Sequence, residues 1–423
     1  MTESGVSDEA RALDAADELA SFRGRFLLPV GADGAPAIYL CGNSLGPLPL
    51  EASVRVEEVL AQWANLGVRG HHVGRAPWLD YHRQFAAPLA RLVGANADEV
   101  VAMNTLTVNL HLLLVSFYRP SASRHRILIE QSAFPSDRYA VDSQLALHGR
   151  SARESLIEVG ARSGEDLLRT EDIIAAIERA GDTLALVLLP GVQYLSGQRL
   201  DIEAITRTAR RQGARVGWDL AHAVGNVPLA LHDADVDFAV WCGYKYLCGG
   251  PGAIAGAFVH QRHAAEALPR LAGWWGHDAA TRFSMGPDFV PMPGAEGWQL
   301  SNPPILALAP LIAALALFDA AGMARLRAKS LALTARARAL IERHCAGRVT
   351  IVTPRAPEAH GAQLSLRLSA GRGRDLFARL EAAGVIGDWR EPDVIRLTPA
   401  PLYNTFAEVD RAVAELANAL VAA

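Results

Sequence analysis

Lys245 stands at the end of an apolar segment and ahead of a glycine-rich turn. Residues 236–252 read VDFAVWCGYKYLCGGPG, and Asp237 is the only charge before the lysine. Apolar surroundings disfavour an ammonium ion, so the pKa of such a lysine falls and its free amine becomes a base or a nucleophile. That amine can condense with an aldehyde. A lysine that snorkels from a strand end towards water is the alternative interpretation.

A carboxylate ends the strand expected just before this one. Residues 215–219 form an apolar segment that closes on Asp219, and ligands of open α/β sheets bind beyond the carboxyl ends of the strands. A carboxylate there can keep a pyridine nitrogen protonated, which makes the ring an electron sink. Pyridoxal phosphate combines such a ring with an aldehyde. Asp219 alone could cap the following segment, but together with Lys245 it indicates this cofactor.

Two further strand ends offer what a phosphorylated ring needs. Residues 104–109 join a strand to a helix, where free backbone N–H groups and threonine hydroxyls can hold a phosphate. Residues 130–137, EQSAFPSD, place Phe134 to stack on a ring and Asp137 as a second carboxylate. Each feature also has an ordinary interpretation as an N-cap, a helix start or a core side chain. Four strand ends that each supply one part of one site favour the cofactor.

The segments that must position these residues alternate in type. Near-continuous apolar strands separated by amphipathic helices predict an α/β fold, with a mostly parallel sheet covered on both faces. Strands are expected at 99–103, 126–130, 155–159, 184–189, 215–219, 236–241 and 253–259, and helices at 106–117, 136–147, 170–180 and 202–212.

The chain changes character on both sides of this alternation. We expect an N-terminal arm (residues 1–50), a large cofactor-binding domain (51–304) and a smaller C-terminal α+β domain (305–423). Ahead of the alternating segments, helices are expected at 8–22, 50–66 and 78–92 and a strand at 38–40. The C-terminal part is expected to contain helices at 305–319, 322–346, 374–383 and 406–421 and strands at 349–352, 363–369 and 393–397.

Composition excludes several classes of function. The 423 residues carry a net charge of −4, which leaves no basic field for nucleic acid. The 4 cysteines are too scattered for a disulfide framework or a zinc site, so free thiols are expected and no metal. The longest apolar run, 305–318, is shorter than the roughly 20 residues of a membrane span, and the N-terminus is too polar for a signal peptide. These features predict a soluble, cytoplasmic protein.

Five short runs together resemble the kynureninases, which are pyridoxal-phosphate hydrolases of the aspartate-aminotransferase fold family (fold type I). The runs are NTLTVNLH (104–111), FPSD (134–137), DLAHAVGN (219–226), YKYL (244–247) and SNPP (301–304). The likeness extends from GNSLG at 42–46 to RLTPAPLYN at 396–404 and so covers nearly the whole chain. An aspartate and a lysine alone would mark only the fold family.

The resemblance implies a role for each site residue. Lys245 would carry the cofactor as a Schiff base, Asp219 would address the pyridine nitrogen, and Tyr244 would move protons near the substrate carbonyl. Other residues implied at the cofactor are Leu106, Thr107, Phe134, Pro135, Ser136, Asp137, His222, Trp274 and Asn302. Pro190 departs from the pattern, because some relatives have a hydroxyl or acidic residue at that strand end.

The implied reaction is hydrolysis of the Cβ–Cγ bond of kynurenine or 3-hydroxykynurenine, in tryptophan catabolism, by a homodimer with interfacial active sites. Arg396 would bind the α-carboxylate, since its planar fork matches a carboxylate; a surface arginine on a strand is the alternative. His71, Ser301 and Asn302 match kynureninases that favour the 3-hydroxylated substrate. His71 as a solvent-facing loop residue is the alternative there.

Other functions on the same fold remain open at this point. A cysteine desulfurase needs an activated thiolate on a mobile loop, whereas Cys345 falls in the end of the helix expected at 322–346. An aminotransferase or a lyase would use the same lysine and aspartate. A non-catalytic binding protein is expected to lose Lys245 or Asp219, and both are present.

Overall fold

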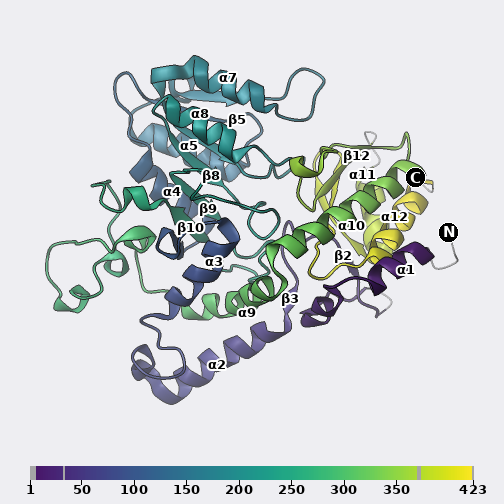
Figure 1. Ribbon diagram of the computed structural model, residues 1–423, viewed down its shortest axis with the longest axis horizontal. Coiled ribbons are helices and arrows are strands. Elements are labelled where there is room, and N and C mark those ends of the chain that lie inside the picture. Colours follow the sequence, from purple (N-terminus) through teal and green to yellow (C-terminus); the bar gives the residue numbers. More distant parts are fainter. Residues whose placement is uncertain (1–5, 32–33, 369–372, 422–423) are drawn as a thin grey trace.

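The computed structural model describes residues 6–31, 34–368 and 373–421. Two lobes lie side by side in Figure 1: a large lobe around one sheet and a smaller lobe that gathers both ends of the chain. Within the described residues, seven strands form the large-lobe sheet in the order β4-β10-β9-β8-β7-β5-β6. Their bounds are β4 Val100–Ala102, β5 Arg126–Glu130, β6 Leu156–Val159, β7 Leu184–Pro190, β8 Arg215–Asp219, β9 Phe238–Trp241 and β10 Gly256–Val259.

The large-lobe sheet is mostly parallel, as predicted. β6, β5, β7, β8 and β9 pair in parallel, and only the β9–β10 and β10–β4 pairs are antiparallel. Apolar side chains of the strands point to both faces, because each face carries a layer of helices. Packed against one face are α4 (Leu106–Phe117) and α5 (Pro135–Leu147); against the other are α7 (Thr170–Ala180) and α8 (Ile202–Arg211). The α/β fold class is thereby confirmed.

The small lobe is built on an antiparallel sheet in the order β11-β12-β15-β14. The strands are β11 Val349–Ile351, β12 Leu364–Leu368, β14 Asp388–Arg390 and β15 Val394–Leu397. Helices α10 (Met323–His344), α11 (Gly373–Ala382) and α12 (Phe406–Val421) share its apolar core. Residues of the N-terminal arm belong to the same core: α1 (Asp8–Ala15) contributes Ala10, and β2 (Ile38–Tyr39) pairs with β13 (Val385–Ile386).

The other helices of the described residues pack on the large lobe. α2 (Leu50–Leu66) follows the short strand pair β1 (Phe26–Leu27) and β3 (Leu48–Pro49), and α9 (Ile305–Ala321) packs along α2. α9 buries Leu308, Leu311 and Leu315 in the core of the large lobe. The remaining helices are α3 (Ala86–Val93) and the single turn α6 (Ala152–Ser155).

The helix predicted for residues 8–22 is shorter than expected and ends at Ala15. The Asp14 side chain accepts hydrogen bonds from the N–H groups of Phe406 and Ala407, at distances of 2.7 and 3.0 Å. Asp14 therefore caps α12, 392 residues away in the sequence, and the chain turns into a 3-10 segment at Ala20–Arg25. The predicted helix was wrong beyond Ala15 because this tertiary contact leaves no local signal.

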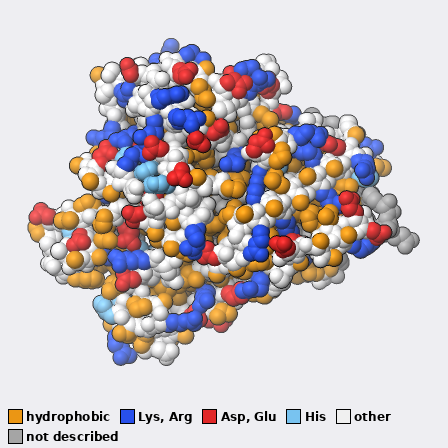
Figure 2. Space-filling view, viewed as in Figure 1, with side chains coloured by type: hydrophobic (Ala, Val, Ile, Leu, Met, Phe, Trp, Pro, Cys, Tyr) orange, Lys and Arg blue, Asp and Glu red, His pale blue; other side chains and the backbone are white. Residues whose placement is uncertain are grey.

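Across the described parts of the chain, no single helix is long and apolar enough to cross a membrane. Only when taken together do α9 and α10 have the length and apolar composition of a membrane span, and the two helices are bent by 84° at their junction. On the face shown in Figure 2, acidic and basic side chains are interspersed with apolar ones, and neither sign of charge dominates.

Candidate active site

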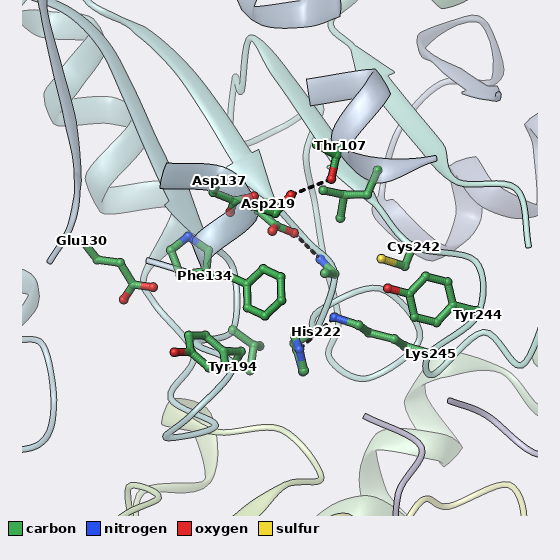
Figure 3. Close-up of a pocket in the computed structure, with 15 residues that line it drawn as sticks. Thr107, Glu130, Phe134, Asp137, Tyr194, Asp219, His222, Cys242, Tyr244 and Lys245 are labelled. Atoms are coloured by element: carbon green, nitrogen blue, oxygen red, sulfur yellow. Dashed lines mark hydrogen bonds between the residues drawn. The ribbon is translucent and has the colours of Figure 1, made fainter. Parts of the chain in front are cut away.

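A pocket opens beyond the carboxyl ends of β5, β7, β8 and β9 (Figure 3). This is the edge at which open α/β sheets bind their ligands. The residues that line it are Leu106, Thr107, Glu130, Phe134, Ser136, Asp137, Pro190, Val192, Tyr194, Asp219, Ala221, His222, Cys242, Tyr244 and Lys245.

Lys245 follows β9 and projects its amine into this pocket. Its Nζ atom lies 3.0 Å from Nε2 of His222 and 5.9 Å from the centre of the Phe134 ring. Burial lowers the pKa of Lys245, and burial together with the Lys245 charge lowers the pKa of His222 well below its ordinary value. The pair therefore favours a neutral imidazole and an amine that gives up its proton readily.

Two aspartates from different strands meet in the same pocket. Asp219 ends β8, and its Oδ1 accepts a hydrogen bond of 2.7 Å from the backbone N–H of Ala221. Asp137 lies in the first turn of α5, where burial and then the Asp219 charge raise its pKa well above the usual range. Burial and a second carboxylate nearby both disfavour the ionised form of Asp137. Its Oδ1 is buried without a hydrogen-bond partner.

The opposite end of the pocket is formed by the starts of two helices. α4 begins at Leu106 and α5 at Pro135, and the Oγ atoms of Thr107 and Ser136 lie 2.7 Å apart between them. The side chains of the N-cap residues, Thr105 and Phe134, accept no hydrogen bond from the first turns of these helices. First-turn N–H groups therefore remain available to a ligand. Helix starts with hydroxyl groups nearby form a seat for a phosphate.

These groups fit pyridoxal phosphate. The hydroxyls and helix starts suit its phosphate, the Phe134 ring suits its flat face, and Lys245 suits its aldehyde. Among the described residues, Oδ1 of Asp137 and Nδ1 of His222, both on residues that line the pocket, are buried without a hydrogen-bond partner. Buried polar atoms are normally satisfied, so a polar ligand in the pocket would complete the site.

Nine residues predicted at the cofactor line the pocket together. They are Leu106, Thr107, Phe134, Ser136, Asp137, Asp219, His222, Tyr244 and Lys245. Pro135 opens α5 between two of them. Burial raises the pKa of Tyr244, whose ring centre is 6.0 Å from the Lys245 amine, so the phenol keeps its proton near neutral pH.

Five other predicted site residues do not line this pocket. His71 ends a 3-10 turn (Gly67–His71) and its ring packs edge-on against Trp78, with centroids 5.2 Å apart. Trp274 is 41% exposed and contacts Phe283, while Ser301 and Asn302 are exposed. Arg396 in β15 is wholly buried; it ion-pairs with Asp388 and donates to the carbonyl oxygen of Tyr194 at 2.6 Å.

Several lining residues were missed by the sequence reasoning. Glu130 ends β5, Cys242 follows β9, and Val192 and Tyr194 follow β7. The rule that ligands bind at carboxyl ends of strands could have found Glu130 and Cys242. Burial raises the pKa of the Cys242 thiol to about 11 and that of the Glu130 carboxyl to about 7. Tyr194 lies four residues beyond its strand, and no local signal marks it.

Solved structures with this fold include enzymes with low sequence identity to the chain. The cysteine desulfurase of Thermococcus onnurineus NA1 superposes with a TM-score of 0.76 at 17% identity, covering 92% of this chain and 95% of its own. The desulfurase CsdA of Escherichia coli gives 0.77 at 18% identity, covering 96% and 99%. A mutant of the cystine lyase C-DES, with glycine linked to its PLP cofactor, gives 0.76 at 20% identity over 94% and 99%. These likenesses concern the fold.

The chain shares its fold with these solved structures, and the donor set of its pocket fits pyridoxal phosphate. Residues 326–416 match the kynureninase C-terminal domain. The kynureninase of Xanthomonas oryzae pv. oryzae (strain PXO99A) is 57% identical over 98% of this chain and 99% of its own length. That of Myxococcus xanthus (strain DK1622) is 57% identical over 96% of each. The chain belongs to the kynureninase family.

Proposed function

We propose that this enzyme hydrolyses the Cβ–Cγ bond of L-kynurenine, of 3-hydroxy-L-kynurenine or of both. The products are L-alanine and anthranilate or 3-hydroxyanthranilate; the water adds OH to the acyl carbon and a proton reaches Cβ. Identity of 57% to kynureninases over nearly the whole chain carries this proposal. The pocket supports it, because Lys245, Asp219 and Asp137 converge there.

The pocket residues divide the work between binding and proton transfer. When bound, pyridoxal phosphate supplies the electron sink for the electron pair left at the substrate Cα. Asp219 would hold the proton on the ring nitrogen, and Thr107 and Ser136 would hold the phosphate. The Lys245 amine, whose pKa is lowered by burial, takes the Cα proton, with His222 at 3.0 Å as a neutral neighbour.

Tyr244 is proposed to handle protons at the γ-carbonyl. Its phenol lies beside Lys245, and the pKa raised by burial keeps it a donor near neutral pH. Arg396 is proposed to hold the α-carboxylate, within the electrostatic reach of Lys245 and His222. A turnover assay of the purified holoenzyme tests the reaction: L-kynurenine should give alanine and anthranilate in equal amounts. Conversion of L-kynurenine to its 2-oxo acid, with the carbon skeleton intact and no anthranilate released, would contradict the proposal and favour an aminotransferase.

A second copy of the chain is proposed to complete the site. His71, Trp274, Ser301 and Asn302 lie outside the pocket, and large apolar side chains are exposed near them. These exposed side chains are Val54, Leu60, Trp63, Val68 and Val73 around α2, and Leu271, Phe283, Met285 and Val290 around Trp274. Surfaces of this kind are typical of subunit interfaces. The homodimer therefore remains a proposal supported by apolar exposure.

Complementation between two inactive variants tests the shared site. If Trp274 serves the partner's Lys245, a hybrid of Lys245→Ala and Trp274→Ala subunits has one intact site. After mixing and subunit exchange, activity should recover to roughly a quarter of wild type, because about half of random dimers are hybrids. No recovery, together with a monomer by light scattering, would contradict the interfacial site.

The division into residues 1–50, 51–304 and 305–423 is also kept as a proposal. The arm residues Val6, Ala10 and Ile38 pack in the small-lobe core, which supports grouping them with it. α9, although it lies after the proposed boundary, packs on the large lobe. A cytoplasmic location is proposed too, since all four cysteines are free thiols, as suits a reducing compartment.

A further inference from the structure

Two arginines of the small lobe share one carboxylate beside the pocket. Asp388 on β14 ion-pairs with Arg396 on β15, and the same Oδ2 atom accepts a hydrogen bond of 3.2 Å from Nε of Arg390. In the described part of the chain, Asp388 is the one carboxylate within ion-pair distance of either guanidinium. Two cations and one anion leave one positive charge without a counter-ion.

The strand register places all three side chains on one face of the small-lobe sheet. Asp388 lies directly opposite Arg396 in the antiparallel pair, and Arg390 follows Asp388 by two residues. Side chains two apart on a strand share a face, as do directly opposed residues. Trp389 points to the other face and packs against Phe377, with ring centroids 6.3 Å apart. This face lies against the wall of the pocket, since Arg396 donates to the backbone of Tyr194.

The donors of Arg396 are largely occupied within the protein. One Nη group donates to Tyr194 and the other pairs with Asp388. With the amide of Asn43 turned to satisfy its neighbours, its oxygen accepts from Nε and Nη2 of Arg396 at 3.2 Å. A neutralised and wholly buried guanidinium attracts an anion weakly by itself. Arg390 differs from Arg396 in two ways. Its side chain is 35% exposed, and its one ion-pair partner, Asp388, is shared with Arg396.

The field of Arg390 also reaches the pocket. Burial, then Lys245, Arg396 and Arg390, lower the pKa of His222. Burial raises the pKa of Tyr194, and the charges of Arg390 and Arg396 oppose that rise. Both residues line the cofactor pocket. A substrate carboxylate that enters between them would therefore meet the unpaired charge.

We propose that Arg390 is a second cation of the substrate-carboxylate subsite, joined to Arg396 through Asp388. Arg396 supplies the Nη1 N–H that Tyr194, Asp388 and Asn43 leave free, Asp388 holds both guanidiniums in place, and Arg390 supplies the net charge that attracts the carboxylate. This inference rests on the proposed function, which makes an α-amino acid the substrate. It assigns a substrate-binding role to Arg390, a residue outside the sequence predictions.

Steady-state kinetics of the holoenzyme test this role. Arg390→Gln should raise KM for L-kynurenine about tenfold and leave kcat within about twofold, since the lost charge acts on binding. Arg390→Lys should recover most of the loss, because a point charge suffices there. Inhibition by the α-carboxamide of kynurenine, which lacks the negative charge, should be unchanged in Arg390→Gln.

Arg374→Gln is the matched control. Arg374 is also a small-lobe arginine, paired with Glu391 next to Arg390, but its side chain is 73% exposed. Its substitution should leave KM unchanged. An unchanged KM in Arg390→Gln, or an equal weakening of kynurenine and its carboxamide, would overturn the proposal.

A binding measurement separates this inference from the reaction itself. L-Alanine and L-alaninamide differ in the carboxylate, and their binding to the holoenzyme can be followed by cofactor absorbance. Arg390→Gln should weaken alanine about tenfold relative to alaninamide, whether or not kynurenine is turned over. If the wild type fails to cleave kynurenine, the proposed function is wrong. The ratio of alanine affinity to alaninamide affinity still decides the role of Arg390. Equal weakening of both ligands would overturn it.

Discussion

The two ends of the proposed substrate site hold their charged groups in opposite ways. At the cofactor end (Lys245, His222, Asp137, Asp219 and Glu130), burial moves the pKa values of four of the five groups towards their neutral forms. At the carboxylate end (Arg396, Asp388 and Arg390), the two guanidiniums are paired with one carboxylate. The cofactor end also contains buried polar atoms without partners.

This difference follows from what each end must do. The proposed reactive amine and ring-binding carboxylates need groups that change protonation readily, and a bound cofactor would supply the missing hydrogen-bond partners. A carboxylate subsite needs a fork fixed before the substrate arrives, because an ordered arginine loses less entropy on binding. The cofactor end therefore depends on its ligand, and the carboxylate end depends on its own ion pairs.

The largest effect is expected at the cofactor end, for Lys245→Ala. This variant loses the Schiff-base amine and the base for the Cα proton, so kcat/KM should fall by more than about a thousandfold with pyridoxal phosphate present. The chain contains one other lysine, Lys329, which is buried and paired with Asp17 at 2.7 Å. Lys329→Arg is the matched control and should keep its activity.

Borohydride reduction gives an independent measurement of the same residue. Reduction of the holoenzyme should fix the cofactor on the peptide that contains Lys245, as read by mass spectrometry. Modification of Lys329 instead, or near wild-type activity of Lys245→Ala, would show that the cofactor end is assigned wrongly.

At the carboxylate end, Asp388→Asn should lower the free energy of unfolding. Asp388→Asn leaves the wholly buried Arg396 without a countercharge, and burial already lowers the pKa of that guanidinium to about 10. Breaking a buried pair in this way costs about 3 kcal/mol of unfolding free energy, which urea unfolding can measure. Asp166→Asn is the control, because Asp166 pairs with Arg367 where both are over a third exposed. It should cost less than about 1 kcal/mol; equal losses would refute the contrast.

A pH effect distinguishes the cofactor end from the carboxylate end. Burial raises the pKa of Glu130 from 4.5 to about 7, so the folded protein binds this proton more tightly than the unfolded chain. Its contribution to stability is therefore fully present below about pH 4.5 and is lost as the pH rises through about 7. Relative to Glu130→Gln, the wild-type apoprotein should lose about 2–3 kcal/mol between pH 5 and pH 8. If the unfolding free energies of the wild type and of Glu130→Gln changed equally with pH, the raised pKa of Glu130 would be contradicted.

Local sequence patterns predicted the elements around the pocket far better than the contacts of Arg396. Strands at 126–130 and 215–219 and the helix at 106–117 were placed at their observed bounds, and each ends or begins at a pocket residue. Those patterns are local, because burial on both faces makes a parallel strand continuously apolar. The strand expected at 236–241 begins only at Phe238, since the Asp237 carboxylate instead accepts from the N–H of Val216 and contacts His263.

The carboxylate end depends on contacts that no local pattern encodes. Arg396 was singled out, but its partner Asp388 comes from β14, a three-residue strand whose pairing sets the contact. Tyr194 and Asn43 reach Arg396 from the large lobe and from the N-terminal arm. Register and lobe packing join these residues, and neither can be inferred from periodicity in one segment.

The smallest expected effect concerns the aromatic part of the substrate, which neither end contacts. We predict a higher kcat/KM for 3-hydroxykynurenine than for kynurenine, by about tenfold, through His71 and Asn302. Both side chains lie outside the pocket of their own chain, so this prediction requires the partner subunit to supply them. A histidine and an amide can both hydrogen-bond a ring hydroxyl, and a site built for that bond disfavours a substrate that leaves its polar groups unpaired.

Replacing both residues together, as His71→Trp plus Asn302→Thr, should reverse the order of kcat/KM for the two substrates. The reaction at Lys245 and kcat for the preferred substrate should persist. Arg69→Gln, which alters the same 3-10 turn without removing His71, is the control and should keep the preference. A wild-type enzyme that prefers unsubstituted kynurenine tenfold would refute this specificity and leave the reaction class standing.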